Sequence, residues 1–450
     1  MLKTLAEPFV ALFARWMPNP FLFAVLLSLL TFVLAWAITG YAPILTIDAW
    51  GGDFWRLLTF SGQIAVTLIT GYALAHTDPV RRLLVRFAGL ARGPASAYVI
   101  VGLAAGVGSL LSWAVGLIVG ALIARQTATV CRQRGIVVHY PLLVATAYAG
   151  FVIWHQGLSS SIGLVIATPG HFLADQIGLI PTAQTIFAPW NMLTTLVILL
   201  TLPFIMARLR PDPGLCVEIP AHLAAAAEID VADDDDGLAP SDISTPARRI
   251  EDARWLNWLL GLGGLIFLGR HFVVHGGGLD LNVVNFAFLV AGLLLARSPI
   301  HYVDLITDGG RTLGPILLQY PFYAGIMGMM LDSGLAVRIA GWFTAIANAH
   351  TLPFWSMISG GLLNMFIPSG GGQWAVQGPI VIDAAKQLGA DIPRVAMGVA
   401  MGDGWTNMIQ PFWTIPALAV AGLHVRDIMG YCVIALVWSG LLFSLGLLFL

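Results

Sequence analysis

Apolar runs of membrane-spanning length recur from near the start of the chain to its end. Those with the length and polar boundaries of simple spans lie at about 21–39, 57–77, 186–207, 255–274, 282–297, 312–331 and 428–450. An α-helix needs about 20 apolar residues to cross the hydrocarbon core of a bilayer. Only helices and closed barrels satisfy their backbone hydrogen bonds there. The pattern therefore predicts an all-α polytopic membrane protein.

Three further apolar stretches, 95–124, 141–168 and 354–382, are too long or too interrupted to be simple spans. Basic residues flank the first of them on both sides: Arg81, Arg82, Arg86 and Arg92 before it, and Arg125, Arg132 and Arg134 after it. The positive-inside rule places both flanks in the cytoplasm. Because both ends lie on one side and small residues occupy the middle, we expect 95–124 to form a re-entrant hairpin.

The chain also resembles itself at an offset near 252 residues. The matching positions are 85–89 with 337–341, 108–112 with 360–364, Pro141 with Pro393, and Trp154 with Trp405 after one residue of slippage. Four matches in the same order predict two membrane repeats, at about 1–210 and 255–450. The stretch 354–382 is then the second re-entrant hairpin.

The number of spans between the two hairpins sets their relative orientation. Five spans separate them, and an odd number brings the second hairpin in from the opposite face. The predicted architecture is an inverted repeat with two re-entrant hairpins and two discontinuous helices, which many secondary transporters use for alternating access. The first half shows one crossing fewer than the second, and we expect the amphipathic segment 4–17 to lie at the interface.

Residues 211–254 form an acidic, proline-containing insert between the two repeats. The insert holds 11 of the 24 acidic residues, including the run Asp233–Asp236. This composition is typical of a solvated linker, here on the cytoplasmic side. A docking or regulatory role is the alternative.

Composition excludes several classes of function. Hydrophobic residues make up 58% of the chain, charged residues 10%, and the net charge is −2, which offers no surface for nucleic acid. The three cysteines are scattered, so neither a disulfide framework nor a metal cluster is predicted. Neither a His-Glu-x-x-His zinc motif nor an ATP-binding Gly-x-x-x-x-Gly-Lys motif is present. We therefore expect no enzyme and no cofactor.

The second hairpin carries the most polar tip. Its candidate binding residues for substrate or ion are Asn364, Ser369, Gly370, Gly371, Gly372 and Gln373. Pro368 and three consecutive glycines disfavour a regular helix here. Freed backbone N–H groups would suit an oxygen-rich anion or its coupling ion. A loop at the membrane surface is the alternative, although apolar residues flank the tip on both sides.

The first hairpin repeats this pattern more weakly, with Ser112 and Trp113 as candidate binding residues. Glycines spaced by four residues, Gly102 with Gly106 and Gly116 with Gly120, are better explained as helix-packing faces than as a site.

A broken span follows each hairpin. The candidate residues are His155, Gln156, Ser159 and Ser160 in the first half, and Asp403, Asn407 and Gln410 in the second. Polar, Gly- or Pro-containing stretches at corresponding positions of two repeats indicate a discontinuous-helix binding site. Half-helix N-termini there would direct partial positive charge at a carboxylate.

Asp403 is the acidic residue that the pattern places well inside a span. A carboxylate at that depth costs about 2.5–3.5 kcal/mol on insertion scales, so we expect it to have a partner or a function. Two interpretations stay open: Asp403 carries a coupling proton, or it caps a half-helix. His155 is likewise either a proton relay or a hydrogen-bonded packing residue.

Several of these motifs resemble one family. The residues that carry the likeness are Arg15-Trp16-x-Pro18-x-Pro20, Gln319-x-Pro321-Phe322-Tyr323-Ala324-Gly325-Ile326, the hairpin tip Pro368–Trp374, Gln377-Gly378-Pro379, Trp405-x-Asn407-Met408-x-Gln410-Pro411-Phe412-Trp413, and Arg426–Cys432. They resemble the bacterial short-chain fatty-acid transporter family over essentially the whole chain.

The resemblance implies uptake of acetoacetate, butyrate and similar monocarboxylates across the bacterial cytoplasmic (inner) membrane. It also implies the ion-transporter superfamily fold, with a scaffold domain that forms a homodimer in the lipid bilayer. Relatives often have His at the position of Gln373 and Asn at the position of Ser112. Both departures lie at hairpin tips, so substrate preference or the coupling ion can differ here.

The expected function is secondary active transport of short-chain monocarboxylates by cation-coupled symport, with H+ or Na+ as the coupling ion. A carrier of C4-dicarboxylates or hydroxy acids is the first alternative. No span centre contains Lys or Arg, which favours a substrate with a single negative charge. A passive carboxylate channel is the second alternative, and it would need a continuous polar lining.

Overall fold

The computed structural model describes residues 2–224, 245–277, 281–311 and 313–450, and every regular element in these ranges is helical. The first part of the chain forms α1 (Leu2–Trp16), α2 (Pro20–Leu34), α3 (Pro43–Gly52), α4 (Leu58–Ala75), α5 (Asp78–Ala88), α6 (Pro94–Leu111), α7 (Trp113–Gln133), α8 (Tyr140–Ala149), α9 (Ser161–Val165), α10 (Ala174–Ile177) and α11 (Pro189–Ala207). The second part forms α13 (Pro246–Glu251), α14 (Arg254–Val273), α15 (Leu281–Leu295), α16 (Pro299–Gly310), α17 (Gly314–Asp332), α18 (Leu335–Thr344), α19 (Leu352–Asn364), α20 (Gly370–Leu388), α21 (Ile392–Thr406), α22 (Pro411–Ala421) and α23 (Val425–Phe449).

These helices confirm the all-α polytopic prediction. Within the described residues, six helical segments are long and apolar enough to cross a membrane: Pro20–Thr39, Pro94–Leu111, Trp113–Gln133, Pro189–Ala207, Pro246–Val273 and Val425–Phe449. A seventh is formed if α17 and α18, bent by 64° at their break, make one span. Proline occupies the start of many of these helices because its fixed φ suits the first helical turn and its missing N–H has no partner to lose there.

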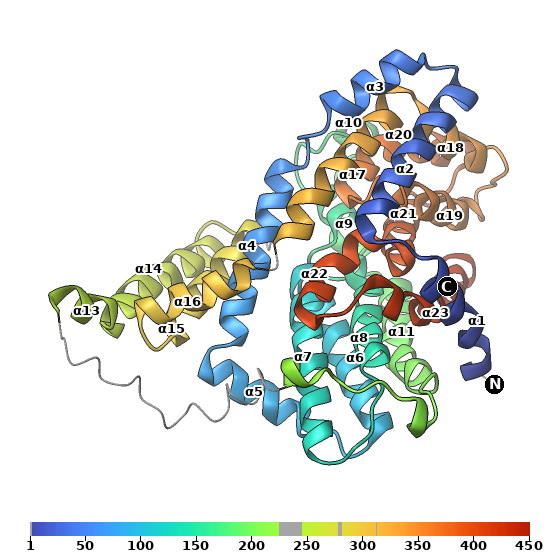
Figure 1. Cartoon of the computed structure of the whole chain (residues 1–450). Helices are drawn as coiled ribbons and strands as arrows, with labels where there is room; N and C mark the ends of the chain where they lie inside the picture. The colour runs from blue at the N-terminus through green and yellow to red at the C-terminus, as the bar shows by residue number, and fades with distance from the viewer. Residues whose placement is uncertain (1, 225–244, 278–280, 312) are drawn as a thin grey trace.

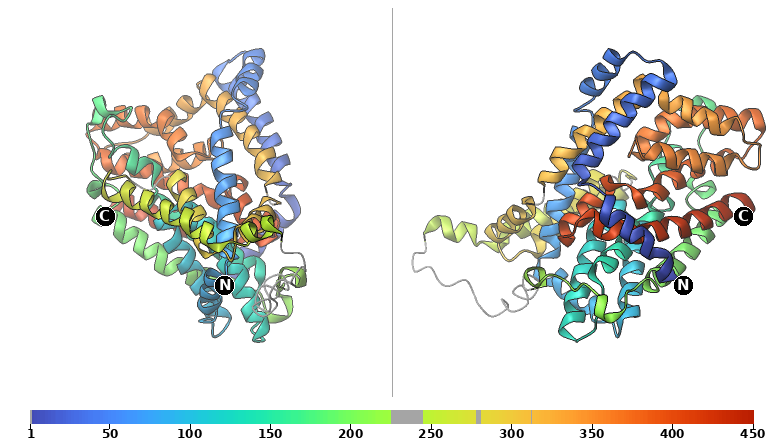
Figure 2. Two further views of the ribbon diagram at one scale, coloured as in Figure 1. Left: turned by 90° about the vertical axis from the view of Figure 1, so that its left-hand side faces the viewer. Right: turned by 45° about the vertical axis from the view of Figure 1, so that its right-hand side comes forward.

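An arm and a body make up the molecule. Figure 1 shows α14, α15 and α16 beside the long α4, standing away from the remaining helices, and the rotated views in Figure 2 agree. In the body, α6, α7, α8 and α11 lie in the lower part of Figure 1, and α18 to α21 lie in the upper part. The lower part belongs to the first predicted repeat and the upper part to the second. A site at the boundary between them therefore contains residues from both repeats.

The stretch 95–124 forms a helical hairpin, as predicted. α6 ends at Leu111, Ser112 is extended (φ −158°, ψ 135°), and α7 begins at the next residue. A Cβ added to Gly108 would lie 3.3 Å from Cα of Gly116, and one added to Gly120 would lie 3.0 Å from Cβ of Ala105. The two members of each pair lie at equal or nearly equal sequence distances from Ser112, so the two arms run antiparallel and pack closely through small residues.

The stretch 354–382 also forms a helical hairpin, held by different contacts. α19 ends at Asn364, residues 365–369 make the connection, and α20 begins at Gly370. Gln373 Nε2 donates to the Gly360 carbonyl at 2.9 Å, and Gln377 Nε2 donates to Ser359 Oγ at 2.8 Å. Side-chain amides therefore bridge the two arms where the first hairpin uses glycine and alanine.

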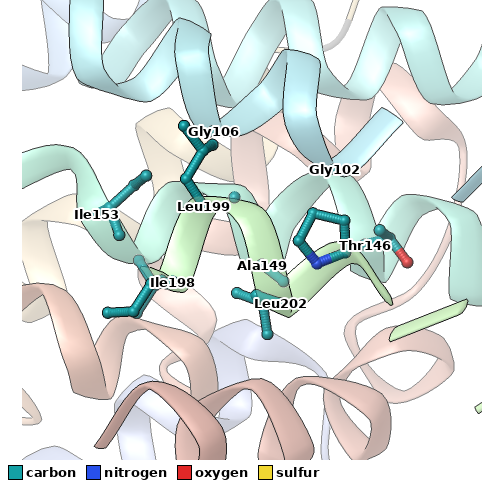
Figure 3. Close-up of a pocket in the computed structure, with 11 residues that line it drawn as sticks. Gly102, Gly106, Thr146, Ala149, Ile153, Ile198, Leu199 and Leu202 are labelled. Carbon is teal, nitrogen blue, oxygen red and sulfur yellow. The ribbon is translucent and has the colours of Figure 1, made fainter. Parts of the chain in front are cut away.

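The glycines of α6 pack against α11, as the small-residue spacing predicts. A Cβ on Gly102 would lie 2.9 Å from the ring of Pro203, and one on Gly106 would lie 2.5 Å from Leu199 Cδ1. Figure 3 shows the small cavity of about 10 Å³ that remains at this contact, lined by α6, α8 and α11. A space of this size and apolar lining is too small for a ligand. These glycines are therefore explained by close helix packing.

The first residues of the predicted linker 211–254 lie against the first half of the chain. Residues 225–244, which contain Asp233–Asp236, lie outside the described residues. Before them, Ile219 is buried, its carbonyl accepts from Arg132 Nη1 at 3.3 Å, and the carbonyl of Leu223 accepts from Arg125 Nη2 at 3.1 Å. The start of the insert thus lies along α7 instead of extending into solvent.

Candidate functional site

The first broken span follows α8. Its helix tightens into a 3₁₀ turn at Gly150–Gln156, reaches an extended Gly157, and resumes as α9 after Ser160. The Ser160 side chain caps α9 by accepting from the Gly163 N–H at 3.2 Å. Gly157 is required at the break because an added Cβ would lie 2.2 Å from the carbonyl oxygen of Leu110 in the first hairpin. The break therefore lies directly against that hairpin.

The second broken span repeats this construction. α21 ends at Thr406, a 3₁₀ turn covers Asn407–Ile409, Gln410 is extended (φ −100°, ψ 123°), and α22 starts at Pro411. The break is dictated locally, because proline disfavours the helical conformation in the residue before it and has no N–H to continue the ladder. Both predicted discontinuous helices are thus present at corresponding positions.

Asp403 and His155 bring the two broken spans together. His155 Nε2 and Asp403 Oδ2 are hydrogen-bonded at 2.9 Å, and both side chains are completely buried. The other ring nitrogen of His155 lies 3.4 Å from Ser160 Oγ. Oδ1 of Asp403 has no hydrogen-bond partner among the described residues. The sequence predicted that the buried carboxylate has a partner, and this partner is a histidine from the other half of the chain, 248 residues away.

Asn364 ties the second hairpin to the second break. Its Nδ2 lies 2.9 Å from the Asp403 carbonyl, 3.0 Å from Thr406 Oγ1 and 2.7 Å from Asn407 Oδ1. In return, Gln410 Nε2 donates to the Asn364 carbonyl at 2.8 Å. The side chains of Asn364, Asn407 and Gln410 and the main-chain carbonyl of Asp403 therefore form one buried polar cluster, next to the carboxylate that pairs with His155.

The start of α20 lies against the imidazole of His155. Ser369 caps this helix by accepting from the Gly372 N–H at 3.3 Å. A Cβ added to Gly370 would lie 2.8 Å from His155 Cε1, so only glycine fits beside the imidazole. A Cβ added to Gly371 would meet no atom within 4 Å. The N-terminus of a 19-residue helix thus opens next to the pair on one side and to free space on the other.

Gln373 lies one turn into α20, away from this opening. Its Nε2 is bonded to Gly360 and Gln377, while its Oε1 has no partner among the described residues. The structure therefore gives Gln373 a clear role in joining the hairpin arms, and a role toward a ligand stays a prediction.

The first hairpin tip lies beside the first break through fewer polar contacts. The backbone N–H of Trp113 donates to Ser159 Oγ at 2.8 Å, and the Trp113 ring packs edge-on against Trp413 with centroids 5.3 Å apart. Ser112 is buried at the break itself. Gln156 is not part of the His155–Asp403 cluster: it lines a separate apolar cavity between α6 and α11.

Aromatic residues surround the pair, and sequence reasoning did not assign them to the site. Trp154 lies against His155 with ring centroids 3.6 Å apart and stacks on Phe151 at 5.8 Å. The indole N–H of Trp154 is buried with no partner among the described residues. The sequence contained a sign that Trp154 matters, because Trp154 and Trp405 occupy matching positions of the internal repeat.

The cluster therefore combines two kinds of unused hydrogen-bonding capacity. Buried oxygens without partners among the described residues are Asp403 Oδ1, Asn364 Oδ1 and Gln410 Oε1. Donors are the Trp154 indole and the N–H groups at the start of α20 other than that of Gly372, which Ser369 caps. Oxygens suit a proton or a small hard cation, and N–H donors at a helix N-terminus suit an anion.

Comparison with known sequences gives a single family. The sequence model described as "Short chain fatty acid transporter" matches residues 1–450, the whole chain. Two curated relatives carry the name "Putative short-chain fatty acid transporter". The one from Escherichia coli K12 is 43% identical over 434 residues, covering 96% of both chains. The one from Haemophilus influenzae is 39% identical over 445 residues, covering 97% of both chains.

Solved structures include two similar transporters. The Alcanivorax borkumensis YdaH transporter matches with 16% identity and a TM-score of 0.47, covering 96% of this chain and 97% of its own. Neisseria gonorrhoeae MtrF matches with 16% identity and a TM-score of 0.44, covering 98% and 97%.

Proposed function

Because this chain belongs to the short chain fatty acid transporter family, we propose that it carries short-chain monocarboxylates such as butyrate and acetoacetate by cation-coupled symport. The family establishes that the chain is a transporter and not an enzyme. The substrate, the coupling and the alternating-access mechanism are the content of the proposal.

The observation that carries the proposal is the buried His155–Asp403 pair. One partner comes from each half of the chain, and the pair lies at the junction of both broken helices and the α20 N-terminus. A carboxylate and an imidazole that share a hydrogen bond can hold one more proton without leaving an uncompensated charge. Intramembrane ionisable pairs of this kind are characteristic of proton pathways in transporters.

The substrate carboxylate is assigned to the neighbouring donors. The start of α20 and the Trp154 ring both lie close to His155. An anion bound at a helix N-terminus gains from the unpaired N–H groups and from the helix dipole. A proton and a carboxylate bound at adjacent positions attract each other, so each raises the affinity of the protein for the other. This coupling of the two binding steps is the basis of symport.

The cation is assigned to H+ for a structural reason. Asp403 already has a hydrogen-bonded imidazole as its partner, whereas a sodium ion prefers a shell of oxygen atoms. Three side-chain oxygens that have no hydrogen-bond partner within the described residues, on Asn364, Asp403 and Gln410, support Na+ as the second candidate. The experiment below separates the two.

Two other functions are weighed against this one. A dicarboxylate carrier would favour a dedicated cation, and neither 140–165 nor 395–421 contains Lys or Arg. A passive channel would need a continuous open polar lining, but His155, Asn364, Asp403 and Asn407 are completely buried. Both observations favour a monocarboxylate carrier.

The proposed setting is a homodimer in the bacterial cytoplasmic membrane. The arm helix α14 supports this placement, because Trp255, Leu259 and Phe267 are each more than half exposed. Such a surface is compatible only with lipid or with another apolar protein face. Chemical crosslinking in native membranes tests whether a second copy covers it.

The decisive experiment is uptake by the purified protein in liposomes. We expect labelled butyrate to enter liposomes that contain the protein faster than it enters protein-free liposomes under the same inward proton gradient, since the protein-free liposomes measure diffusion of the neutral acid, and we expect succinate not to accumulate. Accumulation driven only by a sodium gradient would show that Na+ is the coupling ion, and would assign its binding to the side-chain oxygens of Asn364, Asp403 and Gln410. Equilibration without accumulation under either gradient would show a channel and contradict the symport proposal.

A further inference from the structure

The short helix α5 exposes both arginine and large apolar side chains. Arg82 and Arg86 lie four residues apart and are exposed. Leu83 and Phe87 lie one position further along, also four residues apart, and are 63% and 37% exposed. Residues four apart share one face of a helix, so α5 presents a basic stripe beside an apolar stripe. A third face packs on the protein through Ala88, which is completely buried.

The acidic group of α5 does not neutralise the basic stripe. The helix holds a single acidic residue, Asp78, whose carboxylate accepts from Arg297 Nε and Nη2 at 2.8 and 2.9 Å. The buried Arg81 lies 4.0 Å from the same carboxylate. Arg82 Nε donates to the backbone carbonyl of Asp78 at 3.3 Å, a contact that does not neutralise its charge. The exposed pair, Arg82 and Arg86, therefore forms a surface for an anion.

The place of α5 in the chain puts it at the membrane surface. The preceding α4, a predicted span, ends at Ala75, and α5 begins at Asp78. It ends at Ala88, and α6, the first arm of the hairpin, begins at Pro94. Figure 1 shows α5 at the lower end of α4, next to α7. A short helix between two membrane-entering helices, with apolar and basic stripes side by side, is typical of one that lies in the plane of the interface.

The second repeat provides an internal comparison. At the offset of 252 residues, Arg86 matches Arg338 of α18, but Arg82 matches Gly334. The apolar position after Arg82 is exposed in α5, whereas its match in α18, Leu335, is completely buried. Of the two copies, the first therefore carries the paired arginines beside an exposed apolar stripe. The shared backbone plan of the repeat does not explain these residues, so they indicate a partner on the cytoplasmic side, where the positive-inside rule places α5.

We propose that α5 binds the headgroups of anionic phospholipids in the cytoplasmic leaflet. Arg82 and Arg86 pair with phosphate oxygens, and Leu83 and Phe87 lie among the acyl chains. A guanidinium suits this role because its planar fork donates two parallel hydrogen bonds to a phosphate. The occupant is a lipid and not a soluble anion, because a soluble anion would leave the apolar stripe uncovered.

Lipid binding at α5 has a consequence for the first hairpin. Arg134, which follows α7, donates from Nη1 to the carbonyls of Gly89 and Ala91 at 2.7 and 3.3 Å. The segment directly after α5 is therefore fastened to the end of the hairpin. A lipid-bound α5 holds that end at the level of the headgroups. The surface shares no residue with the His155–Asp403 pair, so the inference is independent of the substrate that is carried.

The test measures lipid binding to the purified protein by native mass spectrometry. The probes are phosphatidylglycerol, which is anionic, and phosphatidylcholine, which has no net charge. We expect wild type to bind phosphatidylglycerol more tightly. Each arginine at an anionic lipid surface contributes about fivefold in affinity, so Arg82→Gln/Arg86→Gln should lose about 25-fold. Arg338→Gln is the matched control, because it occupies the repeat position of Arg86, and it should bind as wild type does.

A second variant tests the apolar stripe. Leu83→Gln keeps both arginines and changes an exposed side chain, so it opens no cavity in the core. It should weaken binding of phosphatidylglycerol about fivefold, because the leucine no longer enters an apolar environment. Inorganic phosphate should not displace the lipid from wild type. Both results separate a lipid surface from a site for soluble phosphate.

Each variant is first checked for a monodisperse profile in detergent, and Arg86→Gln alone, with a loss of about fivefold, replaces a double variant that fails this check. Equal binding of phosphatidylglycerol by wild type and the arginine variant would overturn the inference, and so would an equal loss in Arg338→Gln. Unchanged binding in Leu83→Gln, or displacement by inorganic phosphate, would assign the arginines to a soluble anion and contradict the proposal. None of these outcomes depends on transport, so a failure of the symport proposal leaves the test intact.

Discussion

The two hairpins have the same backbone plan and different interiors. Each has two antiparallel helices, a break at an extended serine (Ser112 or Ser369), and a broken helix lying against its tip. The arms of the first meet through small residues, with Gly116 against Ser109. The arms of the second are joined by amide hydrogen bonds from Gln373 and Gln377. The repeat therefore fixes where the chain breaks, and the side chains decide what each break does.

This difference assigns separate roles to the two halves. The first tip contacts its own broken helix through two hydrogen bonds of backbone N–H groups, from Trp113 to Ser159 Oγ and from Leu158 to the Leu110 carbonyl, and its Trp113 ring packs on Trp413 of the second broken helix. The second tip contacts its broken helix through Asn364 and Gln410, within the cluster that contains Asp403. We therefore expect the first hairpin to be sensitive to size and the second to be sensitive to chemistry.

The largest contrast is expected from labelling of the hairpin flanks. Single cysteines at Arg92, Gln133, His350 and Gln387 occupy exposed positions on either side of the hairpins. If the hairpins are re-entrant and inverted, an impermeant thiol reagent added to intact cells labels positions 350 and 387 and spares 92 and 133. Labelling of only one flank of either hairpin would show that this segment crosses the membrane completely. The two segments could then not be compared as re-entrant hairpins.

The next largest effect concerns the packing of the first hairpin. Gly116→Ala places a Cβ 1.9 Å from Ser109 Oγ and 2.7 Å from its Cα, so the arms must separate. We expect a loss of about 1–3 kcal/mol or more, seen as a lower melting temperature and a lower yield in detergent. Gly371→Ala in the second hairpin is the matched control, because its Cβ meets no atom within 4 Å. Equal behaviour of the two variants would contradict the size-sensitive role of the first hairpin.

Polar substitution should affect the second hairpin. Asn364→Ala removes a side chain that bonds to Asp403, Thr406 and Asn407, and we expect about a ten- to hundredfold loss of apparent affinity in liposome uptake. Ser369→Ala removes a cap and should cost about 1 kcal/mol of stability with weaker transport. Ser112→Ala in the first hairpin should retain kinetics within about twofold, since an isolated small substitution removes little. A stronger effect at Ser112 than at Asn364 would reverse the assignment.

The smallest effect is expected at another carboxylate that links the two halves. Asp78 accepts from Arg297 Nε at 2.8 Å and Nη2 at 2.9 Å, and this hydrogen bonding holds the pKa of Asp78 below its ordinary value of 3.8. A lowered carboxyl pKa stabilises the fold above the unfolded pKa, and this contribution is lost as pH falls through the folded pKa. Asp78→Asn should therefore lower stability by only about 0.2–1 kcal/mol at neutral pH, since the pair is partly exposed.

Thermal unfolding in detergent measures this prediction. The difference between wild type and Asp78→Asn should be about 1 °C or less at neutral pH, should shrink as the pH falls below 3.8, and should vanish only below the lowered pKa of the folded protein. Arg297→Gln should behave as Asp78→Asn does. A large loss of accumulation in either variant would show that the exposed pair, and not the buried one alone, takes part in coupling.

Much of the backbone plan could be predicted from the sequence. Apolar runs located the spans, and the 252-residue offset located both hairpins, because these features are local or periodic. The breaks at Gly157 and Pro411 follow from the residues themselves. The sequence also placed His155 and Asp403 at corresponding breaks of the two repeats, so their proximity could be inferred from the repeat.

Other contacts depend on packing that the sequence alone does not reveal. The glutamines of α20 donate hydrogen bonds to backbone carbonyls of α19. The sequence alone does not distinguish this structural role from ligand binding at a hairpin tip. Trp154 was visible as a repeat position, but its stacking on His155 depends on the 3₁₀ turn that precedes the break. The docking of residues 217–224 along α7 depends on Arg125 and Arg132, which otherwise resemble ordinary positive-inside charges.

The central claim is that the buried His155–Asp403 pair carries the coupling proton. The most direct measurement compares two transport modes of Asp403→Asn in liposomes: accumulation of labelled butyrate against a gradient, and exchange of internal for external butyrate. A permanently neutral Asn mimics the protonated form, and exchange needs only the loaded carrier to reorient. The account predicts that accumulation is abolished while exchange persists. Normal accumulation would contradict it, because Asn also caps helices well, and would return Asp403 to a structural role.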